Sequence, residues 1–229
     1  MMHRLLNSLS LAIVVSSACA RQAPVHTGTT PGGQSRDVII AATTQADSVR
    51  RSFTDADVHF MSGMIPHHAQ AVLIAGWAPT HAARADIRAF CERVVVGQGD
   101  EIAIMQNWLR DRGLPVPAAN STHLRMKMGN MEHDMLMPGM LTPEELAQLD
   151  SARGPRFDRL FLTFMIRHHE GAITMVEELL ASNGAAQDDL IIKLANDIFA
   201  DQTTEIERMK TILAAMSSGG TPPSSKSTR

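Results

Sequence analysis

The sequence predicts an all-α protein in which four helices form a bundle built from a duplicated helical hairpin. The string D-x-x-F-x-x-x-M-I-x-H-H-x-x-A begins at Asp57 and again 101 residues later at Asp158. A second shared string, Q-x-x-E-I-x-x-M, begins at Gln98 and at Gln202. The apolar residues of both copies recur every three or four residues, which is the helical period. Two copies of a helix pair joined by a long crossover give a ferritin-like bundle topology.

Start and stop signals place the first hairpin. Thr54 with Asp57 three residues later resembles a capping box and opens the first long helix. Pro79-Thr80 separates this helix from the second, and Gly113-Leu114-Pro115 ends the second.

The second hairpin carries equivalent signals. Thr142-Pro143-Glu144-Glu145 is a capping box with proline at the first helical position, so a short helix begins there, before the third long helix. Asn183-Gly184 ends the third helix. We expect the second and fourth long helices to run about 25 to 30 residues, on the order of 40 Å at about 1.5 Å per residue.

The composition excludes several classes of protein. Apolar residues make up 44% and charged residues 20% of the 229, and the net charge is -3. These values exclude a disordered chain, a collagen-like repeat and a polybasic binder, so we expect no nucleic-acid partner. The chain has 15 Met and 10 His but only 2 Cys, which excludes a disulfide scaffold and an all-thiolate zinc site.

The first twenty residues have the pattern of an export signal. Arg4 precedes an apolar stretch at residues 9–15 that is too short to span a membrane as a mature helix. The end of the signal has two interpretations. Ala18-Cys19-Ala20 is typical of a cleavage site, whereas Ser16-Ser17-Ala18-Cys19 resembles a weak lipoprotein box in which Cys19 is lipidated. Both predict export to the periplasm or cell envelope, with membrane contact only through a lipid anchor.

Composition shifts along the chain predict its organisation. Residues rich in Pro, Gly, Ser and Thr precede and follow the repeat, and we expect them to form a tether and a tail without regular structure. The expected segments are an export signal at 1–20, a flexible tether at 21–49, the first hairpin at 50–113, a Met/His-rich crossover at 114–142, the second hairpin at 143–216 and a disordered tail at 217–229.

Both copies of the repeat carry an adjacent histidine pair, and these pairs are the first candidate site. The four residues are His67, His68, His168 and His169. A single histidine on an apolar helix face is usually a core residue with a hydrogen-bond partner. Four that converge near a pseudo-twofold axis are costly to bury without partners, so we expect a bound ion or a supporting network. Successive residues point about 100° apart, so one member of each pair is expected to be a ligand and the other a packing or bridging group.

Polar residues on the partner helices are candidates to support the imidazoles. Gln98 and Gln202 are either half-buried surface amides or hydrogen-bond partners of a ligating imidazole N–H, which would fix its tautomer. Glu101 and Glu205 are either solvated or paired groups, or ligands.

The crossover is the second candidate site, because it concentrates thioethers. Its candidate ligands are His123, Met126, Met128, Met131, His133, Met135, Met137 and Met140. One interpretation is a Met-rich helix that packs softly on the bundle. The other is a flexible segment that wraps thioethers around a soft ion. Thioether and imidazole together favour copper(I), or silver(I) by analogy, and thioethers remain ligands in an oxidising compartment.

Several strings also resemble a known family. Met64-Ile65-Pro66-His67-His68, Met137-Pro138-Gly139-Met140, Phe157-Asp158-Arg159-Leu160-Phe161 and the segment 165–172 are similar to the bacterial family called domain of unknown function 305, over residues 50–216. The resemblance implies a secreted ferritin-like bundle. Some members of the family are periplasmic copper-binding proteins linked to copper resistance.

Position by position, the resemblance implies a ligand set in each half. The implied residues are Met64, His67 and His68 in the first copy and Met165, His168, His169 and Met175 in the second. The family's methionine six residues after the second histidine is present as Met175, but the first copy has Ile74. The resemblance therefore does not imply equal occupancy of the two halves.

The function predicted from these features is an exported copper-binding protein that sequesters copper(I) or passes it to a partner protein, without turnover of its own. The first alternative is a ferritin-like di-iron or copper oxidase. A di-iron site needs Glu-x-x-His pairs, and no Glu of this chain is followed three residues later by His. The second alternative is a bundle whose histidine pairs bind a partner protein or sense acid pH.

Overall fold

The computed structural model of the protein describes residues 53–128 and 131–217, and for residues 124–128 and 131–134 it describes only the backbone. The expected export signal, the tether, the acylation site Cys19 and most of the tail lie outside the described residues.

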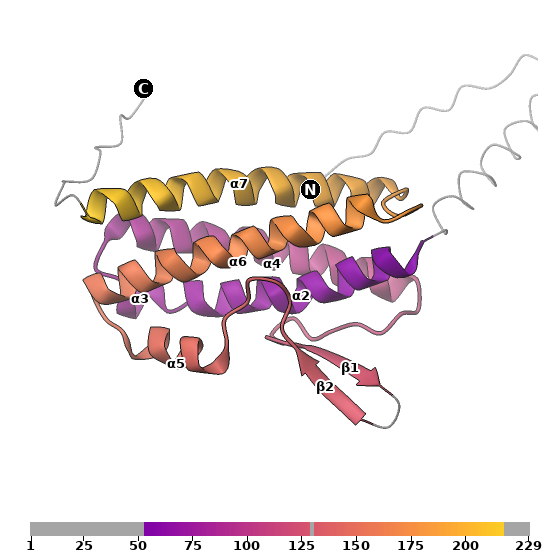
Figure 1. Ribbon diagram of the computed structural model, residues 1–229, viewed down its shortest axis with the longest axis horizontal. Helices are drawn as coiled ribbons and strands as arrows, with labels where there is room; N and C mark the ends of the chain where they lie inside the picture. The colour runs from indigo at the N-terminus through magenta and orange to yellow at the C-terminus, as the bar shows by residue number, and fades with distance from the viewer. Residues whose placement is uncertain (1–52, 129–130, 218–229) are drawn as a thin grey trace, which may run out of the picture. The chain divides into compact units, whose positions relative to one another are not determined.

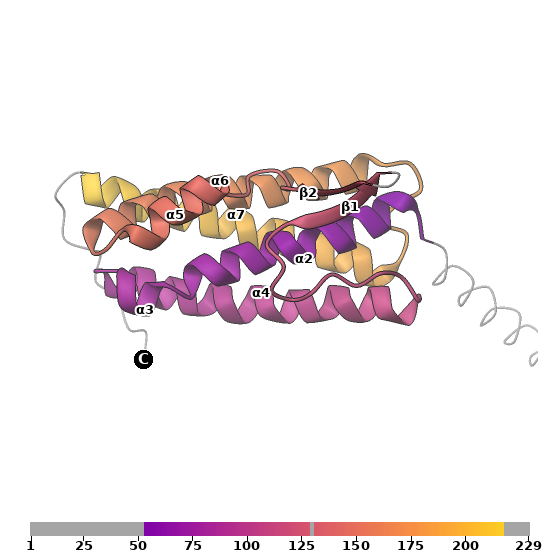
Figure 2. The ribbon, with the colours of Figure 1, turned by 90° about the horizontal axis from the view of Figure 1, so that it is seen from below.

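Four long helices form the bundle: α2 (Asp55–Ala75), α4 (Ala85–Asp111), α6 (Pro155–Ala181) and α7 (Asp189–Ser217). α2 packs along α4, α6 packs along α7, and the two hairpins meet through α2 and α6 (Figure 1). Figure 2 shows the same bundle from below. This arrangement confirms the predicted four-helix bundle of two hairpins. α4 has 27 residues and α7 has 29, as expected.

Two short helices, α3 (Ala78–His81) and α5 (Pro143–Ser151), lie in the connections. Both predicted capping boxes are formed. The Thr54 side chain accepts a hydrogen bond from the Asp57 N–H, and the Asp57 carboxylate accepts one from the Thr54 N–H. Thr142 and Glu145 exchange the same two bonds at the start of α5. Each box satisfies two backbone donors that have no partner inside the helix.

An aspartate near the start of each hairpin ties that hairpin to a loop of the other. Asp57 in α2 accepts a hydrogen bond at 2.7 Å from the Ala186 N–H, between α6 and α7. Asp158, its repeat equivalent in α6, accepts bonds at 3.1 Å from the N–H groups of Ala83 and Arg84, in front of α4. Both carboxylates are buried. These reciprocal bonds give a structural role to the aspartate that opens the repeated string.

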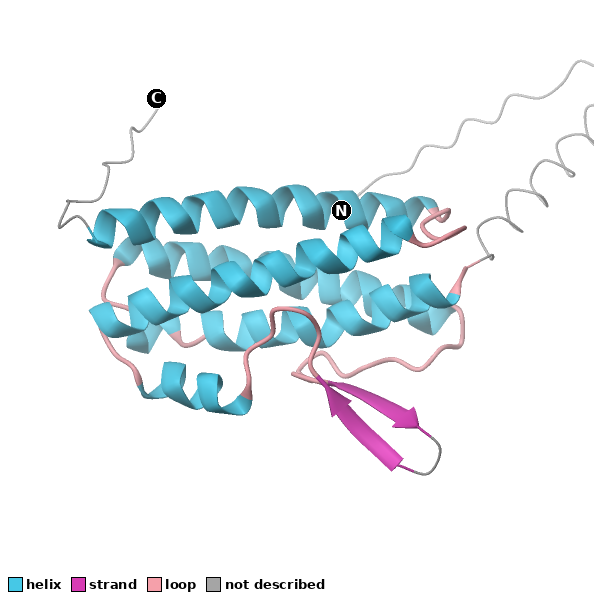
Figure 3. Ribbon diagram, viewed as in Figure 1, coloured by secondary structure: helices cyan, strands magenta, loops and turns pink. Residues whose placement is uncertain are grey.

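Part of the crossover forms a β-hairpin, which the sequence analysis did not predict. Strands β1 (Leu124–Met128) and β2 (Met131–Met135) pair antiparallel, with Leu124 opposite Met135 (Figure 3). Of the two interpretations of the crossover, the Met-rich helix is therefore wrong for this segment, and the ligand-binding segment stays a prediction. The physical reason is alternation: L-R-M-K-M and M-E-H-D-M place an apolar or imidazole residue at every second position, which is the strand period.

The core consists of two apolar clusters, and each long helix contributes to both. One cluster contains the start of α2, the end of α4, the end of α6 and the start of α7. The other contains the opposite ends of the same helices. In every long helix, buried polar side chains lie between the two contributions. Within residues 53–128 and 131–217, none of the helices is long and apolar enough to cross a membrane.

These buried polar side chains form one layer across the middle of the bundle, which we call the polar layer. Its members are His67, His68, Gln98, His168, His169 and Gln202. The repeat places them at the same depth, because each hairpin contributes a histidine pair from its first long helix and a glutamine from its second.

Candidate metal centre

The four histidines of the polar layer are fully buried and form an inner pair and an outer pair. All four side chains have 0% exposure. The rings of His67 and His168 face each other across the interface of α2 and α6, with centroids 3.9 Å apart and planes inclined by 38°. Within each adjacent pair the centroids are 6.2 Å apart. The two members of each pair therefore have different neighbours, as the helical angle between successive residues requires.

The outer imidazoles are held by carboxylates of the partner helix in the same hairpin. The Nε2 of His68 lies 2.7 Å from Oε2 of Glu101, and the Nε2 of His169 lies 2.7 Å from Oε2 of Glu205. Because the carboxylate oxygen accepts, the proton is assigned to Nε2, and Nδ1 of each ring keeps a lone pair. The two bonds are equivalent under the repeat.

The inner imidazoles differ from each other. The Nε2 of His67 donates to the carbonyl oxygen of Pro138 at 3.0 Å, which again leaves the lone pair on Nδ1. Among the described residues, neither ring nitrogen of His168 has a hydrogen-bond partner, nor does Nδ1 of His67, His68 or His169. The polar layer thus contains five buried ring nitrogens without a partner in that part of the chain.

Burial favours the neutral form of His67, His168 and His169. Burial first, and then the nearby His68, lower the pKa of His67 to about 3 against the opposing bond to Pro138. Burial, and then proximity to His67, lowers the pKa of His168 well below its usual value. Burial also lowers the pKa of His169 against the opposing bond to Glu205. A neutral imidazole is the form that binds metal ions.

Thioethers lie next to this layer. A Cβ atom on Gly63 would lie 3.4 Å from Sδ of Met137 and 3.4 Å from Cε of Met175. Met137 from the crossover and Met175 from α6 therefore meet over the α2 backbone one helical turn before His67. The sulfur of Met140 accepts a hydrogen bond from the Met137 N–H at 3.2 Å. All three methionines are buried.

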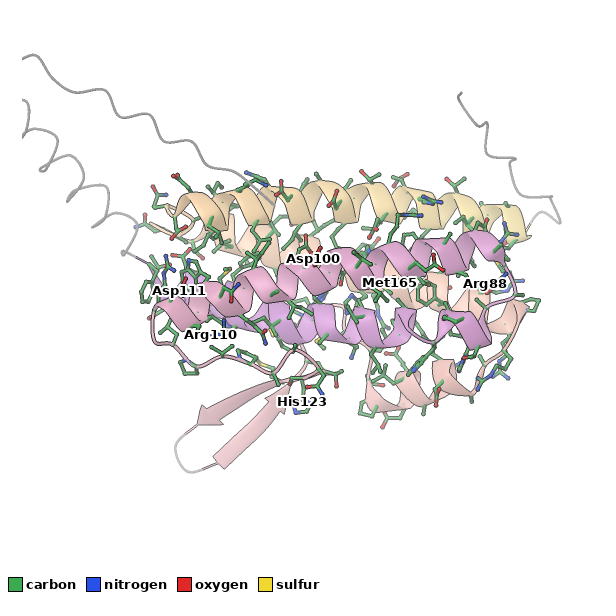
Figure 4. The ribbon with its side chains drawn as sticks, turned by 180° about the vertical axis from the view of Figure 1, so that it is seen from behind. Arg88, Asp100, Arg110, Asp111, His123 and Met165 are labelled. Carbon is green, nitrogen blue, oxygen red and sulfur yellow. The ribbon has the colours of Figure 1, made fainter. Side chains whose placement is uncertain are left out.

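The other predicted thioether and imidazole ligands are more dispersed. Met64 and Met165 are fully buried but belong to different apolar clusters. Met135 is exposed, and His123 lies beside the β-hairpin while Met165 lies within the helices (Figure 4). The side chains of Met126, Met128, Met131 and His133 lie outside the described part of the chain. Among the described residues, no three or more His, Cys, Asp or Glu side chains are grouped so that they could hold a metal ion.

The expected glutamine partners of the imidazoles need correction. Both polar atoms of Gln98 and Oε1 of Gln202 are buried and have no hydrogen-bond partner in the described ranges 53–128 and 131–217. Glu101 and Glu205, one turn further along the same helices, bind the imidazoles instead. A carboxylate is the stronger acceptor for an imidazole N–H, which favours this exchange.

Two further features were not predicted from the sequence. The Pro138 carbonyl is a backbone acceptor and leaves no signal in the side chains. Gln70 is fully buried and binds the crossover backbone at Leu141. A glutamine within the apolar stretch of α2, at a position where the second copy has Gly171, is a signal that could have revealed it.

Cys91 does not join the site. It is buried in the apolar cluster at the other end of α4, and burial raises the pKa of its thiol well above the usual range. The thiolate, which is the metal-binding form, is therefore suppressed.

The fold and the polar layer define a duplicated helical bundle with a buried imidazole and thioether centre. The sequence profile described as Domain of unknown function (DUF305) matches residues 57–213. The chain belongs to this family, as its motifs predicted. A search among curated proteins found no match.

Solved structures of the family have the same fold. A DUF305 fragment from Deinococcus radiodurans has a TM-score of 0.58 and 26% identity, covering 71% of this chain and 98% of its own. A DUF305 protein from Streptomyces coelicolor has a TM-score of 0.58 and 22% identity, covering 73% and 96%. CopM in its Cu(II)-bound form has a TM-score of 0.53 and 28% identity, covering 69% and 95%. CopM has also been solved with Cu(I) and with silver.

Proposed function

We propose that this chain is an exported copper-binding protein that sequesters copper(I) in the cell envelope or delivers it to a partner protein. The observation that carries this proposal is the set of buried imidazole nitrogens that have no hydrogen-bond partner within the described part of the chain and lie next to buried thioethers. Export rests on the signal pattern of residues 1–20.

The buried nitrogens are costly unless a ligand occupies them. A buried polar group without a partner costs roughly 1–3 kcal/mol, and the polar layer has five such ring nitrogens among the described residues. Neutral His168 carries a proton on one of its two nitrogens, so four of the five have a lone pair. A bound cation accepts such lone pairs and removes their share of this cost. Ligand-free packing alone would favour apolar residues of similar volume at these positions.

The chemistry of the donors indicates which cation fits. Neutral imidazole together with thioether favours a soft monovalent ion such as copper(I) or silver(I) over calcium or magnesium. His67, His168, Met137 and Met175 are the residues best placed to supply such donors, since Met137 and Met175 meet one turn before His67. The likeness to CopM, which has been solved with copper and with silver, supports the same class of ion.

The proposal is tested by titrating residues 21–229 with copper(I) under anaerobic, reducing conditions against a chromogenic chelator. Elemental analysis after desalting then counts the retained metal. We expect at least one copper(I) to be retained by the native chain and lost from the double variant His67→Ala/His168→Ala. Exposed His59→Ala is the matched control and should retain the native amount. Cys91→Ala should do the same, because its thiol stays protonated.

Two results would overturn the proposal. One is failure of the native chain to retain copper(I) or silver(I) against the chelator. The other is equal retention by the native chain and by the folded double variant. In either case the histidines of the polar layer would have a packing or partner-binding role.

A further inference from the structure

The crossover returns to the bundle through a short buried segment, residues 137–141, which we call the strap. It follows the β-hairpin and precedes α5, passing close to α2 and α6 (Figure 1). Met137, Met140 and Leu141 are at most 6% exposed. The strap therefore belongs to the core.

On the α2 side, Gln70 binds the strap through both ends of its amide. Its Nε2 donates to the Leu141 carbonyl at 3.0 Å, and its Oε1 accepts from the Leu141 N–H at 2.7 Å. Gln70 is fully buried. Because both bonds are shielded from water, this contact fixes the strap at one register.

On the α6 side, Gly171 leaves the space into which the strap fits. A Cβ atom at this position would lie 2.0 Å from the Pro138 carbonyl oxygen and 2.9 Å from Cα of Gly139. Gly139 itself has φ of +77°, and a Cβ there would lie 2.4 Å from the Arg167 carbonyl oxygen. Backbone packs directly on backbone at this point, so any side chain at Gly171 would displace the strap.

Gln70 and Gly171 occupy the same position of the repeated string, two residues after the second histidine. The strap is a single segment that contacts both halves of the repeat, so the two halves cannot contact it in the same way. One half has an amide that binds the strap, and the other has a glycine that admits it.

The docked strap supplies two contacts to the candidate metal centre. The Pro138 carbonyl accepts the Nε2 proton of His67 and so leaves its Nδ1 lone pair available. Met137 lies beside Met175 over Gly63. A displaced strap would lose both the thioether and the acceptor.

We propose that Gln70 and Gly171 are positioning residues that hold the strap so that Met137 serves as a soft-metal donor beside His67. This inference rests on the copper-binding function proposed above. It assigns the selectivity for soft ions to docking of the strap, because the imidazoles alone would bind Zn(II) as readily.

The test is a double-mutant cycle of Gln70→Ala and Met137→Leu in residues 21–229, read by copper(I) and Zn(II) competition titrations. We expect each single variant to bind copper(I) about 10- to 100-fold more weakly. The double variant should bind copper(I) less weakly than the summed effects of the two single variants, because Gln70 acts partly through Met137 and partly through the Pro138 acceptor of His67. Zn(II) affinity should change less than copper(I) affinity, and X-ray absorption should count fewer sulfur ligands in Gln70→Ala.

Gln106→Ala is the matched control, since the Gln106 amide donates to the Pro117 carbonyl at 2.9 Å in another loop. It should leave copper(I) affinity unchanged. Gly171→Ala should reproduce the effect of Gln70→Ala, and Gly97→Ala, where a Cβ meets nothing within 4 Å, is its control. If Gly171→Ala does not fold, the Gln70 cycle decides alone.

The inference is overturned if Gln70→Ala retains native copper(I) affinity, or if its effect adds fully to that of Met137→Leu. Either result leaves the proposed copper function intact when the native chain still binds copper(I). A native chain that binds no soft ion removes both.

Discussion

At the scale of single residues, the adjacent histidines divide their roles. The inner pair, His67 and His168, meets across the bundle, whereas the outer pair, His68 and His169, binds carboxylates. The carboxylates reach partly into solvent, with 17% and 24% of their side chains exposed, while the imidazoles are fully buried. Each outer histidine thus connects the surface to the polar layer through one hydrogen bond.

The carboxylates should therefore affect metal binding without being ligands themselves. Glu101→Ala leaves the Nε2 proton of His68 without its acceptor and frees the ring to change tautomer. Loss of the bond that supports a ligating imidazole costs about 10- to 100-fold in metal affinity. His68 and His169 are the chain neighbours of the proposed donors, so we expect the lower end of this range, about 10-fold, for copper(I) in Glu101→Ala and in Glu205→Ala. Competition with the chromogenic chelator measures it.

Asp100→Ala is the control for charge, because it removes one exposed carboxylate from the same helix (Figure 4). It should change copper(I) affinity by much less than Glu101→Ala. Equal effects of the two variants would mean that the carboxylates act only through long-range charge and not through the imidazole tautomer.

The convergence of the histidines could be predicted from the repeat, but the identity of their partners could not. Gln98 and Glu101 lie one turn apart on the same helix, so both could face the imidazole. Which of them reaches Nε2 depends on the separation of α2 and α4 at that depth. That separation is set by the packing of the whole bundle and not by the local sequence.

At the scale of secondary structure, the long helices follow from local signals, and the crossover does not follow as readily. The capping boxes and the helical period are local, and both are present as predicted. The methionine content of the crossover predicts ligand chemistry, and the alternation of apolar and polar residues in β1 and β2 predicts strands. The register also places Arg125 opposite Asp134 and Lys127 opposite Glu132, which favours the pairing.

The crossover thus has two parts, the β-hairpin and the strap, with different expected roles in stability. Leu124 pairs with Met135, and opposite residues of an antiparallel pair have Cα atoms about 4.5–5.5 Å apart. A Gly-Gly linker can therefore replace residues 124–135. We expect this deletion to change the free energy of unfolding by less than about 1 kcal/mol, because shortening a surface loop has a small effect. Urea unfolding of the metal-free protein measures it.

The same deletion should lower the number of copper(I) ions retained per chain, because it removes thioethers while leaving the strap in place. A matched deletion of residues 137–141 should instead destabilise or unfold the bundle, since it removes buried core residues. An unchanged copper count after removal of the hairpin would confine the metal to the polar layer.

At the scale of the whole molecule, the polar layer separates two apolar clusters and makes the metal-free bundle sensitive to acid. His67 and His168 are neutral when folded, because burial lowers their pKa values, that of His67 to about 3. In the unfolded chain a histidine has a pKa of about 6.5. From about pH 6.5 down towards pH 3, the unfolded chain therefore binds a proton at His67 that the folded chain excludes.

The sign of the effect follows from this difference in bound protons. Because the unfolded state holds more protons within that window, the free energy of unfolding falls as the pH falls. Well inside the window, each such histidine contributes about 1.4 kcal/mol per pH unit. A histidine with an unfolded-state pKa of about 6.5 is roughly nine-tenths protonated on average between pH 6 and pH 5 in the unfolded chain. We therefore expect urea unfolding of the metal-free protein to show a loss of stability of roughly 2.4 kcal/mol over this interval from His67 and His168 together.

Replacement of a buried histidine by an apolar residue measures how much that histidine contributes to the change in the free energy of unfolding per pH unit. His168→Leu should reduce the slope by about 1.4 kcal/mol per pH unit, because neither of its ring nitrogens has a partner within the described residues and the side chain is fully buried. His59→Gln, which replaces an exposed histidine outside the polar layer, is the matched control. If His168→Leu retains the native slope, His168 is protonated in the folded bundle and the layer is hydrated. If His168→Leu reduces the pH dependence of the free energy of unfolding as expected, the polar layer excludes protons in the folded chain. The same exclusion of protons keeps the imidazole lone pairs available to a metal ion at neutral pH.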